Sequence, residues 1–171
     1  MNSSKPIGET PMSLKPRPVL ASRTIMTELV LPSHTNALGS IFGGTVTSWI
    51  DICAAISAQR HAGRPVVTAS IDALTFIKPV FKGYIVNLKA SVNFTAKTSM
   101  EVGVRVEAEN PLTGERFHTA SAYLTFVALG ENMKPTEVPP VIAETPEEMR
   151  RLVAAKKRRE DRLAARTKIS Q

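Results

Sequence analysis

The sequence contains little cysteine and histidine and no long apolar run. Its single cysteine, Cys53, excludes an intrachain disulfide, which fits a reducing compartment. The three histidines have neither the spacing nor the cysteine or acidic companions of a metal site, so we expect no metal. No apolar run reaches the roughly 18 residues of a membrane span, and no apolar core follows the basic residues of the N-terminal segment. We therefore expect a cytoplasmic protein with neither a membrane span nor a signal peptide.

The net charge of +7 is concentrated near the C-terminus. Residues 146–168 contain nine Lys and Arg against four acids, which accounts for five of the seven excess positive charges. The run Pro146-Glu147-Glu148 is typical of a helix start, with proline in the first turn and acids near the positive end of the dipole. This segment has no aromatic residues to stack on bases, so we favour a solvated or subunit-covering helix and expect no nucleic-acid partner.

Hydrophobic periodicity predicts one helix and five strands in the middle of the chain. Residues 24–31 alternate as a strand does, and an apolar helix runs from residue 43 or 44 to residue 61. Four segments rich in β-branched residues follow, at 66–78, 84–95, 100–108 and 116–128. The turns between them are short, which favours antiparallel pairing. One long apolar helix and one sheet bury each other best when the sheet curls around the helix, so we expect an α+β fold.

The composition divides the chain into three parts. Residues 1–23 are rich in Ser, Pro and Lys without sustained periodicity, so we expect a flexible N-terminal tail. Residues 24–138 contain the predicted helix and strands and form the expected domain. Residues 139–171 comprise the end of a proline-containing linker and the basic C-terminal helix.

One stretch, residues 36–51, joins a polar loop to the start of the apolar helix. Gly43 and Gly44 leave the first backbone N–H groups of the helix uncovered by side chains, so a substrate oxygen could approach the positive end of the dipole. About two turns further on, Asp51 lies among apolar residues that cover nearly every face of the helix, and we expect its carboxylate to be buried. Both features indicate a site, although a glycine pair can serve close packing and an interior Asp can simply bond to a neighbouring strand.

Three blocks of the sequence resemble the hotdog-fold acyl-CoA thioesterases of the cytosolic acyl-CoA hydrolase type. In chain order they are PSHTNALGSIFGGTVTSWID, VVTASIDALTFIKPVFKGYIV and KTSMEVGVRVEAENPLTGER, and the resemblance covers residues 24–138. It implies a hotdog fold, in which a five- or six-stranded antiparallel sheet wraps a long central helix. It also implies homodimers with joined sheets and active sites between the subunits, often assembled into hexamers as trimers of dimers.

The resemblance implies an enzyme that hydrolyses fatty acyl-CoA, with functional residues at Asn36 and Asp51. Asp51 would act as general base on water or as the attacking nucleophile, and these routes stay open. Backbone N–H groups at Gly43, Gly44 or Thr45 would stabilise the oxyanion, and Asn36 of the opposite subunit would orient the water or the thioester. No cofactor is expected, because coenzyme A is part of the substrate and product.

The expected contacts to coenzyme A follow from the same resemblance and involve Thr68 and Ser70 in a strand and the turn Lys97-Thr98-Ser99. Asp72 is either a second polar group near the site or a residue of the sheet surface. A non-catalytic acyl-CoA sensor is the alternative function, and a hotdog enzyme of other chemistry, such as a hydratase or dehydratase, is a third possibility. The presence of both Asn36 and Asp51 favours the hydrolase.

Overall fold

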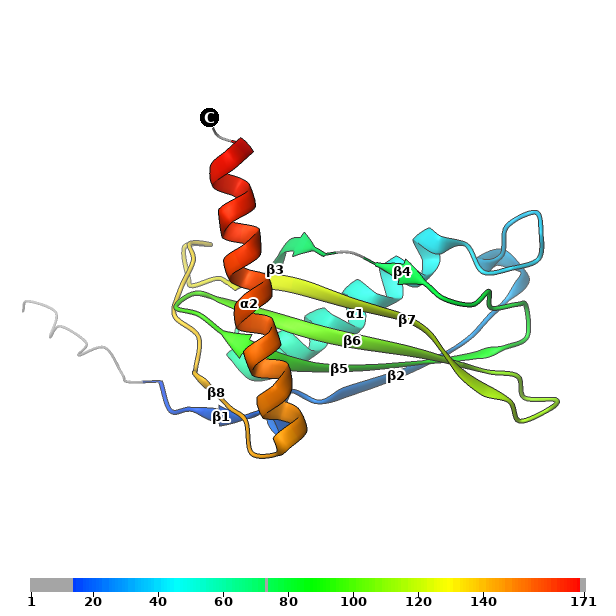
Figure 1. The fold of residues 1–171 in the computed structure, drawn as a ribbon, viewed down its shortest axis with the longest axis horizontal. Coiled ribbons are helices and arrows are strands. Elements are labelled where there is room, and N and C mark those ends of the chain that lie inside the picture. Colours follow the sequence, from blue (N-terminus) through cyan, green and yellow to red (C-terminus); the bar gives the residue numbers. More distant parts are fainter. Residues whose placement is uncertain (1–13, 73, 170–171) are drawn as a thin grey trace, which may run out of the picture.

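The computed structural model describes residues 14–72 and 74–169 of the chain. Two long helices and three long strands dominate it (Figure 1). In chain order the elements are β1 (Arg17–Pro18), the 3₁₀ helix η1 (Val19–Ser22), β2 (Thr24–Leu29), the 3₁₀ helix η2 (Pro32–His34), α1 (Gly43–Ala62), β3 (Val66–Ile71), β4 (Thr75–Phe76), β5 (Ile85–Thr95), β6 (Ser99–Glu109), β7 (Arg116–Ala128), β8 (Val141–Ile142) and α2 (Pro146–Ile169).

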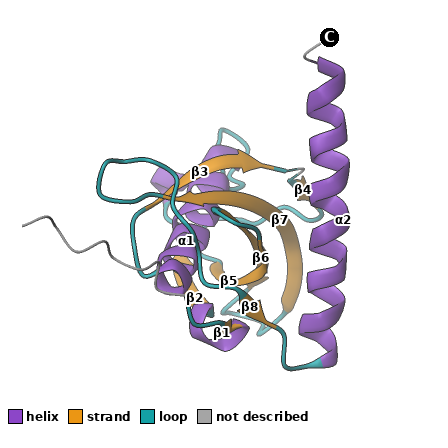
Figure 2. Cartoon of the chain, turned by 90° about the vertical axis from the view of Figure 1, so that its left-hand side faces the viewer, coloured by secondary structure: helices purple, strands orange, loops and turns teal. Residues whose placement is uncertain are grey.

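The main sheet is antiparallel, with the strand order β2-β5-β6-β7-β3 and with β4 also paired to β7. It curls around α1, which lies against its concave face, while α2 lies across the opposite face (Figure 2). We call these the inner and the outer face of the sheet. The arrangement confirms the expected α+β hotdog fold with a central helix and an additional C-terminal helix.

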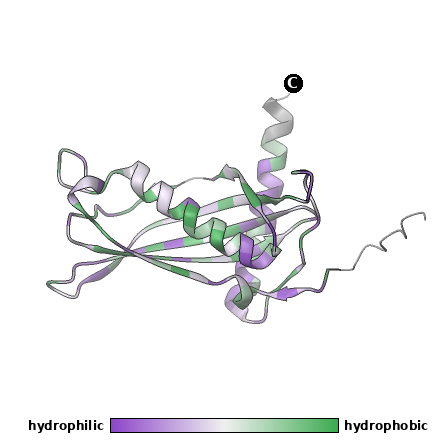
Figure 3. Ribbon diagram, turned by 180° about the vertical axis from the view of Figure 1, so that it is seen from behind, coloured by the Kyte–Doolittle hydropathy of each residue, from purple (hydrophilic) through white to green (hydrophobic). Residues whose placement is uncertain are grey.

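The core lies between α1 and the inner face. Ile50 and Ala54 of α1 are fully buried against strand residues such as Leu88 and Leu124. Hydrophobic residues, coloured green, recur along α1 and along the strands behind it (Figure 3). Burial raises the pKa of the Cys53 thiol to about 11, so at neutral pH Cys53 is a protonated core residue. α1 ends at Gly63, whose positive φ of 67° suits a glycine in the C-cap position.

The segment expected to be one strand over 66–78 is interrupted. β3 ends at Ile71, and regular strand pairing with β7 resumes at Thr75 and Phe76, which form β4. A bulge between Thr68 and Ser70 shifts the register of β3 on β7. Because a bulge inserts an extra residue into the alternation, the residues on its two sides no longer follow one pattern of inner and outer faces. Continuous alternation in the sequence therefore concealed the break.

The flanks of the domain differ from the expected tail and linker. Residues 1–13 lie outside the described part of the chain, but residues 17–22 are packed rather than tail-like. β1 pairs in parallel with β8. Ser22 is fully buried, and its Oγ accepts a hydrogen bond of 2.9 Å from the N–H of Val92. Arg17 donates from Nη1 to the carbonyl of His61, so the N-terminal segment also caps the end of α1.

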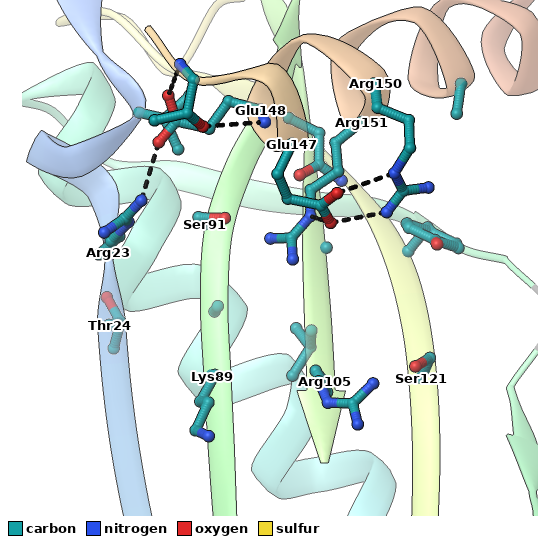
Figure 4. Close-up of a pocket in the computed structure, with 18 of the residues that line it drawn as sticks. Arg23, Thr24, Lys89, Ser91, Arg105, Ser121, Glu147, Glu148, Arg150 and Arg151 are labelled. Carbon is teal, nitrogen blue, oxygen red and sulfur yellow. Dashed lines mark hydrogen bonds and ion pairs between the residues drawn. The ribbon is translucent and has the colours of Figure 1, made fainter. Parts of the chain in front are cut away.

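α2 begins at Pro146, and a capping box fixes its start. The N–H of Glu148 donates to Thr145 Oγ1, and Glu148 Oε2 accepts from the N–H of Thr145. Figure 4 shows Glu148 paired with Arg23 and Glu147 paired with Arg150 in this first turn. The helix then packs on the outer face of its own sheet, with Ala155 fully buried. α2 is thus an integral layer of the subunit.

A buried ion pair anchors the middle of α2. Arg158 donates to both carboxylate oxygens of Glu101, at 2.7 and 3.1 Å, and its guanidinium lies 3.6 Å from the ring centroid of Tyr123. The Glu101 side chain is 1% exposed and that of Arg158 is 26% exposed. Glu101 Oε1 also accepts from Asn93 Nδ2. Because the carboxylate has left water almost completely, it depends on these partners.

Replacing Arg158 with Ala should destabilise the protein by about 3 kcal/mol, at the lower end of the range for breaking a buried pair, because water can reach the Arg158 side. Urea unfolding of the variant and of wild type measures the difference. Lys157→Ala, an exposed neighbour on the same helix, is the control and should change stability little. Equal effects of the two variants would contradict the anchoring role of Arg158.

Stability should also fall at acidic pH because of His61. This residue is fully buried, its Nε2 lies 2.8 Å from the carbonyl oxygen of Pro139, and its Nδ1 has no hydrogen-bond partner in the described residues. Burial lowers the pKa of His61 below the ordinary 6.5, so the unfolded chain takes up this proton at a higher pH than the folded protein. The stabilisation is therefore complete above pH 6.5 and is lost as the pH falls through the lowered pKa.

The measurement is the free energy of unfolding between neutral and mildly acidic pH for wild type and His61→Gln. Wild type should lose stability with a slope that exceeds that of the variant by at most about 1.4 kcal/mol per pH unit. Parallel curves would show that His61 does not carry the acid sensitivity.

Candidate active site

The loop before α1 is folded by Asn36. Its Oδ1 accepts a hydrogen bond of 2.9 Å from the N–H of Leu38, and its Nδ2 donates to Ser40 Oγ at 2.9 Å. The Asn36 N–H donates to the carbonyl of Ser40, and Gly39 has a φ of 78° in the tight turn. Leu38, at the tip, is 87% exposed. The amide is therefore held in a defined loop that projects from the subunit.

The start of α1 presents backbone N–H groups without intrahelical acceptors. Thr45, however, already donates its N–H to the carbonyl of Phe42 at 2.9 Å, which leaves Gly43 and Gly44 as the better oxyanion donors among the three expected residues. A Cβ at Gly44 would lie 2.9 Å from the Phe42 ring, and a Cβ at Gly43 would lie 3.5 Å from the Phe76 ring. Glycine thus lets two partly exposed aromatic rings lie close to the helix start.

Asp51 is held by a threonine of the sheet. Its Oδ1 accepts a hydrogen bond of 2.8 Å from Thr68 Oγ1 of β3, and its Oδ2 accepts none from the described residues. The expected full burial of this carboxylate is not found, because Asp51 is half-buried and its neighbour Ile52 is 48% exposed. One side of the apolar helix is uncovered in the single chain. An apolar helix sequence indicates that the helix is buried, but it does not show whether its own sheet or a second chain buries each side.

Ser70 is placed away from Asp51. In the register of β3 on β7, Thr68 lies opposite Phe126, a core residue of the inner face, whereas Ser70 lies opposite Thr125, the next residue along. Opposed residues share a face, and consecutive strand residues do not, so the bulge places Ser70 on the outer face. Its Oγ is buried there without a hydrogen-bond partner in the described residues, as is Thr125 Oγ1.

The turn Lys97-Thr98-Ser99 lies at the same end of the sheet as the start of β3. Ser99 pairs with Val127, which in turn pairs with Val67. The backbone of the turn is ordered, because the carbonyl of Thr98 accepts from the N–H of Ala128 and that of Lys97 accepts from the N–H of Val138. The Lys97 side chain is 80% exposed, with its Nζ 3.7 Å from a Glu137 oxygen.

The helix start and Asp51 lie too far apart to act together within one chain. Asp51 is eight residues after Gly43 in a continuous helix, which corresponds to about 12 Å along the axis. The donors must lie about 3 Å from the carbonyl oxygen, while Asp51 must reach the carbon bonded to that oxygen directly or through one water, so the two groups must meet around one C–O bond. Asn36 likewise makes no hydrogen bond to Asp51 or Thr68 within the described residues.

A cavity of about 510 Å³ between the start of α2 and the outer face is remote from these groups, and neither Asp51 nor Thr68 lines it. Basic side chains that line this cavity are paired with carboxylates. Arg23 pairs with Glu148, and Lys89 and Arg105 both pair with Glu107; Figure 4 shows these three basic side chains.

Within residues 14–72 and 74–169, no three His, Cys, Asp or Glu side chains gather as metal ligands do. No helix of that part of the chain is long and apolar enough to cross a membrane.

A sheet that curls around a long apolar helix in this strand order is the hotdog fold. The sequence profile of the thioesterase superfamily matches residues 38–115. The uncharacterized acyl-CoA thioester hydrolase YkhA of Bacillus subtilis is 45% identical over 128 residues, which is 75% of this chain and 74% of YkhA. The chain belongs to the thioesterase superfamily and, within it, to the family of these acyl-CoA thioester hydrolases.

Other relatives extend this assignment. The cytosolic acyl coenzyme A thioester hydrolase of Rattus norvegicus is 34% identical over 146 residues, which cover 84% of this chain and 38% of that longer protein. A solved apo-hexameric acyl-CoA thioesterase is 47% identical, with a TM-score of 0.86 over 89% of this chain and 97% of the other.

The acyl-CoA hydrolase of Staphylococcus aureus has structures with bound ligands and with single substitutions that can be compared with the candidate site. Its structure with butyryl coenzyme A, coenzyme A and coenzyme A disulfide has a TM-score of 0.85 and 37% identity, covering 91% of this chain and 94% of that one. Structures also exist of its variants with an Asn, an Asp or a Thr changed to Ala. In that enzyme the Asp follows the Asn by 15 positions and the Thr follows the Asp by 17, the spacing of Asn36, Asp51 and Thr68.

Two of the residues expected at the site, Asp51 and Thr68, lie in direct contact within one chain. Thr68 was expected to contact coenzyme A, and the structure shows in addition that its hydroxyl donates to the carboxylate of Asp51. The sequence showed only a hydroxyl that alternates with apolar residues along a strand, a pattern that many structural threonines share. Only the register of β3 beside α1 distinguishes Thr68 from Ser70.

Proposed function

We propose that this protein is a cytoplasmic hydrolase that converts fatty acyl-CoA to fatty acid and free coenzyme A. The observation that carries the proposal is the carboxylate of Asp51, fixed by Thr68 on one oxygen and available on the other, at the uncovered side of α1. Membership of the acyl-CoA thioester hydrolases supports it, as do the coenzyme A complexes of the S. aureus relative. The rat relative, named as cytosolic, supports the compartment.

The reaction needs an oxyanion site, a nucleophilic oxygen and a thiolate leaving group. The N–H groups of Gly43 and Gly44 stabilise the negative charge that develops on the thioester oxygen, with the helix dipole assisting. The thiolate of coenzyme A leaves as the C–S bond breaks and needs little acid assistance. The lack of an obvious acid beside Asp51 is therefore compatible with turnover.

Asp51 acts by one of two routes. As a general base, Oδ2 takes a proton from water while the water oxygen attacks the thioester carbon. As a nucleophile, the carboxylate attacks the carbon, releases the thiolate and forms an anhydride that water then hydrolyses. In both routes the Thr68 hydroxyl fixes Oδ1 and so aims the other oxygen.

The site is formed between two subunits. Gly43 and Asp51 are separated by about 12 Å of helix, so the donors that serve one Asp51 come from the helix start of a second chain, together with its Asn36. Apolar residues at the β3 edge and along the uncovered side of α1 provide a surface for that chain, with Ile52 48%, Val67 47% and Ile71 42% exposed. We propose three such dimers per hexamer, by analogy with the hexameric relative.

Coenzyme A approaches at the end of the sheet that carries the turn Lys97-Thr98-Ser99. The exposed ammonium of Lys97 can meet a phosphate, and the hydroxyls of Thr98 and Ser99 can donate to one. Thr68 lies beside the thioester, where its hydroxyl binds Asp51, and Ser70 lies on the outer face of the sheet.

The first test is release of coenzyme A thiol from a panel of acyl-CoAs, short to long, by wild type and Asp51→Ala. Wild type should turn over, and the variant should lose turnover while it still dimerises and binds coenzyme A, because the substitution removes the reacting carboxylate and leaves the groups proposed to contact coenzyme A in place. Asp161→Ala, an exposed acid of α2, is the matched control with unchanged activity. Activity of Asp51→Ala within a few-fold of wild type would contradict the assignment. Binding of acyl-CoA by wild type without thiol release would favour the sensor.

A mixed dimer tests the shared site. Asn36→Ala should lose on the order of 10²-fold in turnover, as for removal of one positioning or oxyanion donor. The heterodimer of Asn36→Ala and Asp51→Ala subunits can be purified through two different tags. If each site takes Asn36 from one chain and Asp51 from the other, one site carries both substitutions and the other site carries neither. The heterodimer should then show about half the wild-type activity per dimer, as two-fold symmetry requires. A heterodimer as inactive as its parents would place Asn36 and Asp51 in the same chain's site.

A further inference from the structure

α2 is fastened to the strand that carries Thr68. One turn after Arg158, Arg162 donates from Nη1 to Asp72 Oδ2 at 2.7 Å, and the two side chains are only 20% and 26% exposed. Asp72 directly follows the last residue of β3. The N–H of Asp72 also donates to the carbonyl of Tyr123, whose ring lies under Arg158. Two arginines one turn apart in α2, Arg158 and Arg162, thus hold the end of β3 and the strand beside it.

β3 needs such support because it is a short, bulged strand at the edge of the sheet. Within the chain it pairs on one side only, with β7. A shift of one residue in an edge strand exchanges its inner and outer side chains. Here that shift would remove the Thr68 hydroxyl from Asp51, which lies 2.8 Å away in the observed register.

The outer face offers little to hold the bulged register by hydrogen bonding. Ser70 and Thr125, opposed beyond the bulge, bury their hydroxyl oxygens without partners in the described part of the chain. Unpartnered buried hydroxyls are a cost that the register must offset elsewhere. The Arg162–Asp72 ion pair lies on this face at the end of β3, two residues after Ser70.

We propose that Arg162 is a positioning residue for the hydrolysis reaction, which acts through Asp72 to hold the β3 bulge in register and so keeps Thr68 on Asp51. The inference rests on the proposed function, since Thr68 matters for rate only if Asp51 is catalytic. It assigns the basic C-terminal helix a role in turnover, on the opposite face of the sheet from the reacting atoms. It also gives Asp72 a function as the link between helix and strand.

The experiment is a double-mutant cycle between Arg162 and Thr68. Arg162→Gln should lower kcat roughly 3- to 30-fold in the wild-type background, the range for coupling through a packed network, with KM little changed. In the Thr68→Ala background, Arg162→Gln should change kcat less than about twofold. The Thr68 hydroxyl, which Arg162→Gln would misplace, is already absent there. Arg162→Lys should restore part of the rate by keeping the charge. Lys157→Gln, on an exposed position of α2, is the control.

Two outcomes would overturn the proposal. Equal fold-losses from Arg162→Gln in both backgrounds would indicate a general structural effect, and an unchanged kcat would indicate no effect on the site. Hydrogen exchange of the amides of residues 66–72 provides a readout that does not need activity. Protection there should fall in Arg162→Gln and not in Lys157→Gln, and unchanged protection would refute the link to β3. If wild type releases no thiol from any acyl-CoA, the proposed function fails, while the exchange data still decide whether Arg162 holds the strand.

Discussion

The hydrogen bond from Thr68 to Asp51 joins the central helix to the edge of the sheet, and the candidate site depends on it. A carboxylate on an otherwise apolar helix is costly unless a polar partner meets it. Thr68 satisfies one oxygen and leaves the other to water or substrate. The partner lies on an edge strand, so the geometry of the carboxylate depends on how firmly that edge is held.

The sequence predicted those parts of the fold that follow from local patterns. The start of α1 at Gly43 and its end beside Gly63 were expected because a glycine pair precedes an apolar run and a glycine with proline after it ends one. The span of β7 over 116–128 was also predicted, since strict alternation lies between two turn signals. Both patterns involve residues close together in the chain.

Features that depend on distant residues could not be predicted in this way. Arg158 and Glu101 are 57 positions apart and Arg162 and Asp72 are 90 apart, so the excess charge of α2 gave no sign that two of its arginines are partly buried in ion pairs. The bulge in β3 and the packing of residues 17–22 are similarly decided by neighbouring strands. For the same reason Asn36 was expected in the site only from the resemblance, and the bond from Thr68 to Asp51 was not expected at all.

In the proposed dimer, in which two subunits share the active site, the edge strand β3 has to meet two opposed requirements. Its outer edge must stay unpaired within the chain so that a second subunit can join it, yet its register must be fixed to within one residue. Pairing with β7 alone meets the second requirement poorly, because the strand is bulged. A contact from the outer face can fix the strand without covering its edge, and α2 lies on that face with Arg162 at the end of β3. The C-terminal helix is thus placed where it can stabilise the register and leave the edge free for assembly.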